Sequence, residues 1–316
     1  MQRIPKPPRS PLPPVSGTPT VAVVIPCFND AHYLGDAIES VRGQTRAADE
    51  IVVVDDGSTD DSASIANGAP GVRYLRQRNA GTSAARNAGL VAVRSEFVQF
   101  LDADDVLLPT ALEAGLRCAS ARPTCAFVAG RHVVVRGEDS HERPWPELAS
   151  GDLYAELLRL NFVACLDAVL FRRAPLLESG AFDTSLRACE DYDVLLRLAR
   201  LHPAALHDDV VAEYRLRADS LSGDTRRMYD SIMTVLARQR PYVQDDPERA
   251  EALRAGWRFY YHYFGRPMLD RAVDRLRRRE AILDPLRAFA SVAEHDRGAL
   301  KWYLRDKLAP TSEPPG

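Results

Sequence analysis

The sequence predicts an α/β fold in which a mostly parallel sheet is flanked by helices and followed by a helical C-terminal region. Two apolar, β-branched runs, at 21–25 and 51–54, are typical of strands buried on both faces. Segments with helical periodicity separate these strands from two more, expected at 72–75 and 97–101. Strands that alternate with helices favour parallel pairing. Beyond residue 225 the strand pattern stops and helical periodicity continues.

The remaining elements follow from the same patterns. One helix after the first strand presents an apolar face made of Leu34, Ala37, Ile38 and Val41. Later elements are expected as helices at 60–66, 83–93, 110–120 and 190–201 and as strands at 125–129, 132–135 and 168–171. The C-terminal helices are expected at 228–240, 248–264, 268–279 and 285–295. We therefore divide the chain into a disordered proline-rich tail at 1–19, an α/β domain at 20–224, a helical region at 225–309 and a frayed end at 310–316.

Composition and charge exclude several classes of protein. The 316 residues carry 41 basic and 44 acidic side chains, a formal net charge of −3, so no global positive field attracts nucleic acid and we expect no nucleic-acid partner. No apolar run reaches the roughly 18 residues of a membrane-spanning helix, and the proline-rich start lacks the apolar core of a secretory signal. The five cysteines form no CxxC pair, which is typical of a reduced protein. We expect a cytoplasmic protein.

Three carboxylates follow the strand expected at 97–101. Asp102, Asp104 and Asp105 stand within four residues, and like charges this close repel one another unless a cation or hydrogen-bond donors neutralise them. Oxygen ligands suit Mg²⁺ and Mn²⁺, which often bind through one or two carboxylates together with substrate phosphates. The alternative is an acidic cap at the start of the next helix. The first interpretation predicts a metal site.

A second acidic pair, Asp55 and Asp56, follows the strand expected at 51–54. One interpretation is an ordinary turn. The other is a carboxylate that accepts hydrogen bonds from a nucleotide base or ribose. Ligands of α/β sheets lie beyond the carboxyl ends of the strands. Because both acidic clusters and the segment 26–29 follow such ends, we expect all three to line one rim of the sheet.

Two further segments offer charged groups. Gly81 permits close approach of the backbone and precedes a helix N-terminus, which favours anions. Arg86, on that helix, is suited to pair with a phosphate or to orient the carboxylates. Glu190 and Asp191 begin an amphipathic helix, where acids stabilise the helix dipole. A carboxylate there is equally suited to take a proton from an acceptor hydroxyl as general base.

Five motifs in order resemble the family 2 glycosyltransferases. They lie within residues 20–222 and are Val24-Ile-Pro-Cys-Phe-Asn29, Ile51-Val-Val-Val-Asp-Asp-Gly-Ser-Thr-Asp60, Asn79 through Asn87, Leu101-Asp-Ala-Asp-Asp105 and Glu190-Asp191. Each motif is weak alone, but five at this spacing are specific. The resemblance implies a GT-A fold and an inverting transfer of a sugar from a nucleotide diphosphate sugar, with UDP as the expected nucleotide. The implied acceptor is a hydroxyl on a glycan or a lipid-linked sugar, in the synthesis of polysaccharide, glycolipid or glycoconjugate.

The resemblance also implies a role for each residue. Asp191 would be the general base, and Glu190 would shape the acceptor site. Asp104 and Asp105 would hold Mn²⁺ or Mg²⁺ on the diphosphate. Among the donor-binding residues, Asp56 would contact the base and Asp102 would lie near the ribose and the donor sugar. The full donor-binding set is Pro26, Phe28, Asn29, Asp55, Asp56, Gly81, Arg86, Asn87, Asp102, Ala103 and Arg217.

One position departs from the family pattern. In Tyr214-Arg-Leu-Arg217 many members of the family carry a histidine where this chain has Arg217. A guanidinium has five donors and no acceptor lone pair, so it can hold phosphate oxygens but cannot ligate a metal. We therefore do not expect the late loop to contribute a metal ligand through this residue.

Other classes of α/β protein lack their motifs here. A dinucleotide-dependent oxidoreductase needs G-x-G-x-x-G after the first strand, where this chain has Pro26-Cys-Phe-Asn29, and no P-loop motif occurs. Two alternatives stay open. One is a non-catalytic nucleotide-sugar binding module, and the other is a sugar-phosphate nucleotidyltransferase, although the glycine-rich basic first loop of that class is absent.

The C-terminal region carries a basic patch beside apolar side chains. Its arginines are Arg271, Arg275, Arg277, Arg278 and Arg279, and the apolar neighbours are Leu269, Val273, Leu276 and Ile282. One interpretation is a solvated helix face. The other is a peripheral contact with anionic lipid at the inner face of a membrane, which would suit a lipid-linked acceptor.

Overall fold

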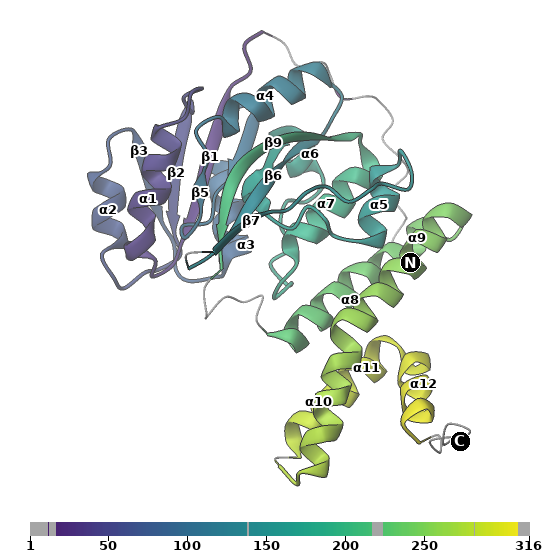
Figure 1. The fold of residues 1–316 in the computed structure, drawn as a ribbon. Helices are drawn as coiled ribbons and strands as arrows, with labels where there is room; N and C mark the ends of the chain where they lie inside the picture. Colours follow the sequence, from purple (N-terminus) through teal and green to yellow (C-terminus); the bar gives the residue numbers. More distant parts are fainter. Residues whose placement is uncertain (1–11, 13–16, 138, 217–223, 281, 309–316) are drawn as a thin grey trace. The chain divides into compact units, whose positions relative to one another are not determined.

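The computed structural model describes residues 12, 17–137, 139–216, 224–280 and 282–308 (Figure 1). The chain divides into two compact units. The first holds the described residues up to Leu157, then Asn161–Leu186 and those from Glu190 to 216, and the second holds Leu158–Leu160, Arg187–Cys189 and those from 224 onward. The predicted end at 310–316 and most of the predicted tail at 1–19 lie outside the described residues. We retain 20–224 and 225–309 as the proposed domains.

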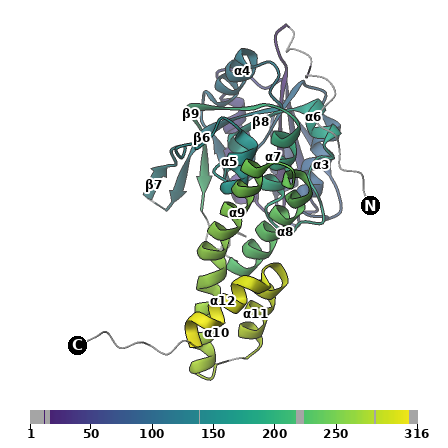
Figure 2. The same ribbon diagram turned by 90° about the vertical axis from the view of Figure 1, so that its right-hand side faces the viewer.

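The described residues of the first unit form a nine-stranded sheet in the order β3-β2-β1-β4-β8-β6-β9-β5, with β7 paired to β6 (Figures 1 and 2). The strands are β1 Val21–Cys27, β2 Glu50–Asp55, β3 Val72–Arg76, β4 Phe97–Phe100, β5 Val106–Leu107, β6 Phe127–Arg136, β7 Asp139–Glu142, β8 Val169–Arg172 and β9 Ala204–Arg215. Strands β1 to β4 pair in parallel, as predicted. Strand β8 runs antiparallel to β4 and to β6, so the complete sheet is mixed.

Strand β1 continues past its predicted end. It was expected to stop at residue 25, but Pro26 pairs with Val54 and Cys27 with Asp55 in the parallel register with β2. On the other side of β1 the register with β4 ends at Val24 and Phe100. Pro26 therefore lies beyond the last residue paired with β4, where its missing N–H does not interrupt that ladder.

Helices flank this sheet. They are α1 Ala31–Arg42, α2 Ser62–Gly68, α3 Thr82–Ala92, α4 Ala111–Ala121, α5 Leu153–Arg159, α6 Arg173–Glu178 and α7 Glu190–Leu201, with the 3₁₀ turn η1 at Leu166–Ala168. The predicted apolar face of α1 is buried in the core. Helix α3 packs so close to β1 that a Cβ at Gly89 would lie 2.2 Å from Val24 Cγ1. Glycine at this position therefore sets how near Arg86, on the same helix, lies to the sheet.

The later strands differ most from the prediction. The strands expected at 125–129 and 132–135 form the single strand β6, which has register shifts against β9 between Ala129 and Arg131 and again between Arg131 and His132. Strand β9 was not predicted. Its polar Asp208 and Asp209 break the apolar alternation by which a half-buried strand is recognised.

Helices make up most of the described residues of the second unit, and none of these residues lies in a strand. Its helices are α8 Thr225–Val243, α9 Pro247–Tyr260, the π-helical turn η3 Tyr261–Gly265, α10 Arg266–Arg277, α11 Leu283–His295 and α12 Arg297–Leu308. Side chains of Asp224 and Asp246 cap α8 and α9 by accepting from Arg227 N and Arg249 N. The predicted helical C-terminal region is thus confirmed. No helix among the described residues is both long and apolar enough to cross a bilayer.

Candidate active site

The predicted polar segments meet at the carboxyl edge of the parallel strands. Cys27 and Asp55 are register partners, and Asp56 N donates to Cys27 O at 2.8 Å, so the ends of β1 and β2 are joined. Asn29 continues this link: its N donates to Ser58 Oγ at 2.9 Å, and its Oδ1 accepts from Thr59 N at 2.8 Å. Asn29 holds a φ of 56°, in the left-handed region that asparagine tolerates. The predicted rim is therefore formed here.

Asp55 is an internal anchor of this rim. Its side chain is fully buried and accepts from Ser58 N at 2.7 Å and from Tyr74 Oη. Burial alone would raise the pKa of Asp55, but the hydrogen bonds from Tyr74 and Ser58 together lower it, so the carboxylate is charged. Phe28, by contrast, is 45% exposed at the same edge and offers an open aromatic face.

Asp56 fixes the loop that leads into α3. Its Oδ1 accepts from Gln77 Nε2 at 2.7 Å and from Ala80 N at 2.9 Å, and its Oδ2 accepts from Gly81 N at 2.7 Å. Gly81 caps α3 with a φ of 92°, which an L side chain rarely adopts. The carboxylate and the loop therefore hold each other in place. A contact of Asp56 with a nucleotide base stays a prediction.

Arg86 connects three motifs that are distant in sequence. Its Nη2 lies 2.7 and 2.9 Å from the two carboxylate oxygens of Asp102, and its Nη1 lies 2.7 Å from Glu190 Oε1. The guanidinium also lies 5.5 Å from the ring centroid of Phe182. The Arg86 side chain is 5% exposed, whereas those of Asp102 and Glu190 are partly exposed. One buried cation thus holds two acids at the edge of the site.

Asp191 lies beside this network at the start of α7. The next residue, Tyr192, is fully buried and donates its hydroxyl to Leu157 O at 2.6 Å, which fixes the first turn of the helix. Asp191 itself is partly exposed. Burial, followed by the charge of Glu190, raises the pKa of Asp191 to about 7. A carboxyl that titrates near neutral pH is suited to proton transfer.

An acidic cluster lies next to Asp102. Ligand oxygens of Asp102, Asp105 and Asp167 lie within 4.8 Å of one another. Asp167, in η1, accepts from Asp102 N at 2.7 Å, and Asp105 accepts from Arg215 N at 2.6 Å. Asp105 and Asp167 are buried, whereas Asp102 is partly exposed. All the donor atoms are oxygens, which suits Mg²⁺ and Mn²⁺.

The two buried acids are in contact with each other, and the pKa of each is raised. Burial, followed by the charge of Asp167, raises the pKa of Asp105 well above its usual range. Burial, followed by the charge of Asp102, also raises the pKa of Asp167. Two carboxyl groups in contact inside a protein cannot both ionise without large cost, so one stays protonated and bonds to the other.

Asp105→Asn is therefore expected to stabilise the protein at pH 8 in metal-free buffer. A carboxyl whose pKa is raised on folding loses stability as the pH rises from its unfolded pKa of roughly 4 toward its folded value. The amide keeps an acceptor for Arg215 N and has no proton to lose, so the melting temperature at pH 8 should rise by roughly 2–4 °C and its decline with pH should flatten. Thermal unfolding at pH 5 and pH 8 measures this, with exposed Asp61→Asn as the control. Parallel pH slopes for wild type and Asp105→Asn would contradict a shared proton.

The other predicted residues take different places. Asp104 is partly exposed on the segment after β4, outside the cluster of three, and Ala103 is buried. Asn87 uses both ends of its amide on the backbone of Phe182, donating to the carbonyl at 2.8 Å and accepting from the N–H at 2.9 Å. Arg217 lies outside the described residues. Donor binding by Asn87 and Arg217 stays a prediction.

Asp167 was missed by the sequence analysis. It stands alone in the apolar stretch 162–171, and a single acid in such a stretch signals a buried carboxyl that must find a partner. Sequence alone does not say that this partner is Asp105, because the two lie on segments that only the sheet brings together.

Comparison with known proteins identifies the family of this chain. Residues 22–180, about half of the chain, match the family model described as glycosyl transferase family 2, so the chain belongs to this family. Among curated proteins, it is 26% identical over 212 residues to the uncharacterized glycosyltransferase RP339 of Rickettsia prowazekii, covering 64% of this chain and 65% of that protein. It is 30% identical over 192 residues to chondroitin synthase of Escherichia coli, covering 58% of this chain and 27% of the synthase. The chain thus spans less than two thirds of the length of these relatives.

Solved structures agree on the fold. A structure of S. aureus TarS 1–349 in complex with UDP-GlcNAc superposes with a TM-score of 0.66 at 17% identity, covering 87% of this chain and 80% of that one. Mannosyltransferase PcManGT from Pyrobaculum calidifontis, in complex with GDP-Man and Mn²⁺, gives a TM-score of 0.58 at 20% identity, covering 95% and 84%. The predicted GT-A fold is confirmed.

Proposed function

We propose that this chain is an inverting glycosyltransferase that moves a sugar from a nucleotide diphosphate sugar, with UDP as the expected nucleotide, to a hydroxyl acceptor. The observation that carries the proposal is the Arg86 network. Arg86 joins Asp102, from the segment after β4, to Glu190, and the neighbour of Glu190 is Asp191, whose pKa is raised. The relative named chondroitin synthase and the fold neighbours solved in complex with UDP-GlcNAc or GDP-Man support the same class of donor. The acceptor class we propose is a glycan or a lipid-linked sugar.

In the proposed reaction, Asp191 takes the proton of the acceptor hydroxyl while that oxygen attacks the anomeric carbon of the donor. The bond from that carbon to the diphosphate oxygen breaks, and the configuration inverts because attack and departure occur on opposite faces. A pKa of about 7 keeps a large share of Asp191 deprotonated at neutral pH while leaving it basic enough to help. Glu190, held by Arg86, keeps a negative charge beside Asp191 and so sustains that basicity.

The acidic rim fits a divalent cation on the diphosphate. We assign direct ligation to Asp104 and Asp102, because both are partly exposed to a cation that arrives with the donor, whereas Asp105 and Asp167 are buried. Asp105 would then hold the segment that carries Asp102 and Asp104 in position through its contacts with Arg215 N and Asp167. A bound Mn²⁺ or Mg²⁺ would neutralise charge that builds on the leaving diphosphate.

Asp104→Ala is expected to weaken metal-dependent binding of UDP by about tenfold or more, since a lost carboxylate ligand removes a charged contact with the cation. Titration calorimetry of UDP with Mn²⁺ and with a chelator separates the metal-dependent part. Binding without metal should be unchanged, and exposed Asp61→Ala is the matched control. If Asp104→Ala bound UDP as wild type does in Mn²⁺, the ligands would have to be sought among Asp102, Asp105 and Asp167 instead.

Donor hydrolysis tests the function as a whole. A panel of nucleotide sugars is first screened for thermal stabilisation, because a ligand of the native state raises the melting temperature. The stabilising donor is then incubated with wild type and with Asp191→Asn in Mn²⁺, and release of the nucleotide diphosphate is measured. Release by wild type alone supports the transferase. Stabilisation with no release by wild type, with or without candidate acceptors, would favour a non-catalytic binding module.

A further inference from the structure

An apolar corner stands between α10 and α11 in the second unit. We define it as Leu276 at the end of α10 and Ile282, Leu283 and Leu286 at the start of α11. The last three are 63%, 67% and 55% exposed. Leu286 N donates to Ile282 O at 3.2 Å, so this first turn is helical, and residues three and four apart share one helix face. The three side chains therefore form one exposed apolar stripe.

The inner face of α11 is mostly apolar as well, with Ser291 as its one buried polar residue among those described. Pro285, Ala288 and Val292 are buried within the second unit. A surface helix of a globular protein normally presents polar residues outward and one apolar stripe inward. A helix that has an exposed apolar stripe in addition to a buried one typically contacts another apolar surface, such as a partner protein or a bilayer.

Arginines outnumber acidic residues in the segment that contains this corner. Residues 271–287 contain six arginines and three acids, although the whole chain has a formal charge of −3. The acids are used in exposed pairs, with Arg275 lying 3.4 Å from Glu280 and 3.1 Å from Asp284. Arg278 and Arg279 have no ion pair among the residues that the structure describes. Their guanidinium groups can therefore bind an external anion.

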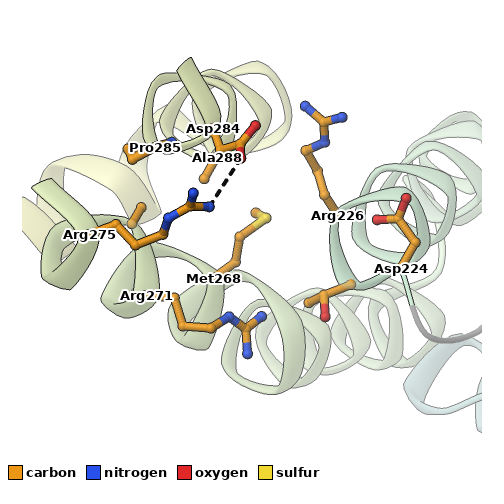
Figure 3. A pocket seen from close by; sticks show the side chains of 10 residues that line it. Asp224, Arg226, Met268, Arg271, Arg275, Asp284, Pro285 and Ala288 are labelled. Carbon is orange, nitrogen blue, oxygen red and sulfur yellow. Dashed lines mark hydrogen bonds and ion pairs between the residues drawn. The ribbon is translucent and has the colours of Figure 1, made fainter. Parts of the chain in front are cut away.

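A cavity beside the corner adds two more guanidinium groups that have no ion pair within 4 Å among the described residues. It has a volume of about 350 Å³ and lies between α8, α10 and α11, with Arg226, Arg271, Arg275 and Met268 among its lining residues (Figure 3). Figure 3 shows Arg275 reaching Asp284, while Arg226 and Arg271 come from α8 and α10 and reach no acid in the view. Neither guanidinium makes a hydrogen bond or ion pair within the described part of the chain. Guanidinium groups suit phosphate oxygens.

We propose that the apolar corner docks on the surface of an anionic phospholipid bilayer. The exposed stripe enters the boundary between headgroups and acyl chains, the unpaired arginines lie among the headgroups, and the cavity receives a lipid phosphate. A second copy of the chain fits less well, because a two-fold interface on this corner would set the same arginines against one another. The proposal does not depend on the glycosyltransferase reaction.

Sedimentation of the full chain with vesicles tests the proposal. Vesicles of phosphatidylcholine alone are compared with vesicles rich in phosphatidylglycerol, at roughly 50 mM and roughly 500 mM salt, because screening weakens headgroup contacts at high salt. We expect binding to the anionic vesicles at low salt and about tenfold weaker binding at high salt. The combined change Ile282→Ser, Leu283→Ser and Leu286→Ser should weaken binding about tenfold or more, and Arg226→Ala with Arg271→Ala about threefold or more.

Matched controls separate this surface from general effects. Val91→Ser removes an equally exposed apolar side chain from the first unit, and Arg254→Ala removes an exposed arginine from α9. Both are expected to bind vesicles as wild type does, and circular dichroism melting checks that every variant folds.

No binding to anionic vesicles, or unchanged binding by the triple serine variant, would overturn the proposal. So would light scattering that shows a dimer dissociated by the triple substitution, since the corner would then be a self-interface. Donor hydrolysis in solution should be unaffected by these changes, which keeps this test independent of the proposed reaction.

Discussion

Asp191→Asn is expected to lower sugar transfer by about 10²–10⁴-fold, the range that a positioned general base supplies. The amide has nearly the same shape as the carboxylic acid but cannot accept the acceptor's proton. Donor binding should stay close to that of wild type, because the proposed donor contacts lie on other residues. Initial rates with saturating donor, together with calorimetry of the nucleotide diphosphate, measure the two effects separately.

The pH profile gives this prediction a sharper form. The pKa of Asp191 is raised to about 7, so kcat/KM of wild type should rise with pH and level off above that value, as the active carboxylate forms. The same shift costs the native state stability as the pH rises from roughly 4 to about 7, so Asp191→Asn should unfold at the same or a higher temperature at pH 8. A variant that folds well and loses its rate shows a chemical role. Near-normal turnover in Asp191→Asn would remove Asp191 as the base.

Glu190→Gln is the companion variant. The charge of Glu190 is the second cause of the raised pKa of Asp191, after burial. Removing that charge should move the rising limb of the profile to lower pH and reduce the rate on the plateau, since a weaker base accepts the proton less readily. A limb that stayed in place would mean that burial alone sets the pKa.

The fold was predictable where local patterns and long-range pairing agree. The runs 21–25 and 51–54 are apolar throughout because β1 and β2 are covered on both faces, and such a run has few alternatives to a buried strand. Strand β9 carries His207, Asp208 and Asp209 within its length and shifts register against β6, so neither alternation nor continuity marks it. Such a strand forms because of the strands it pairs with, and local sequence patterns do not reveal which strands those are.

The position of the candidate residues on one rim was predictable from the sequence, whereas their contacts with one another were not. The rule that ligands lie beyond the carboxyl ends of parallel strands brought Asn29, Asp56 and Asp102 to one rim. It did not say which acids would be sealed inside. Asp105, predicted as a metal ligand, belongs to the acidic cluster and is buried. Its contact with Asp167, from a segment 62 residues later, is one that no spacing rule predicts.

Arg86→Ala is expected to be the most disruptive single change in the site. The side chain is 5% exposed and holds Asp102 and Glu190 at hydrogen-bond distance, so its loss leaves two like charges facing a buried void. Removing one partner of a buried ion pair costs about 3–5 kcal/mol in free energy of unfolding. The partial exposure of both acids should place this variant near the lower end of that range. Transfer should fall by at least about a hundredfold, because both the donor-side and the acceptor-side acids lose their position.

Arg86→Lys separates position from charge. Lysine keeps the positive charge but has one ammonium in place of a planar fork, so it can hold one acid well but not both in the observed geometry. We expect it to recover most of the stability lost in Arg86→Ala and little of the activity. Urea unfolding and initial rates measure the two effects, and a double-mutant cycle with Glu190→Gln isolates the coupling between the residues. If Arg86→Ala retained wild-type stability and activity, the bridge between the two motifs would have no part in assembling the site, and the proposed arrangement of Asp102, Glu190 and Asp191 would lose its physical basis.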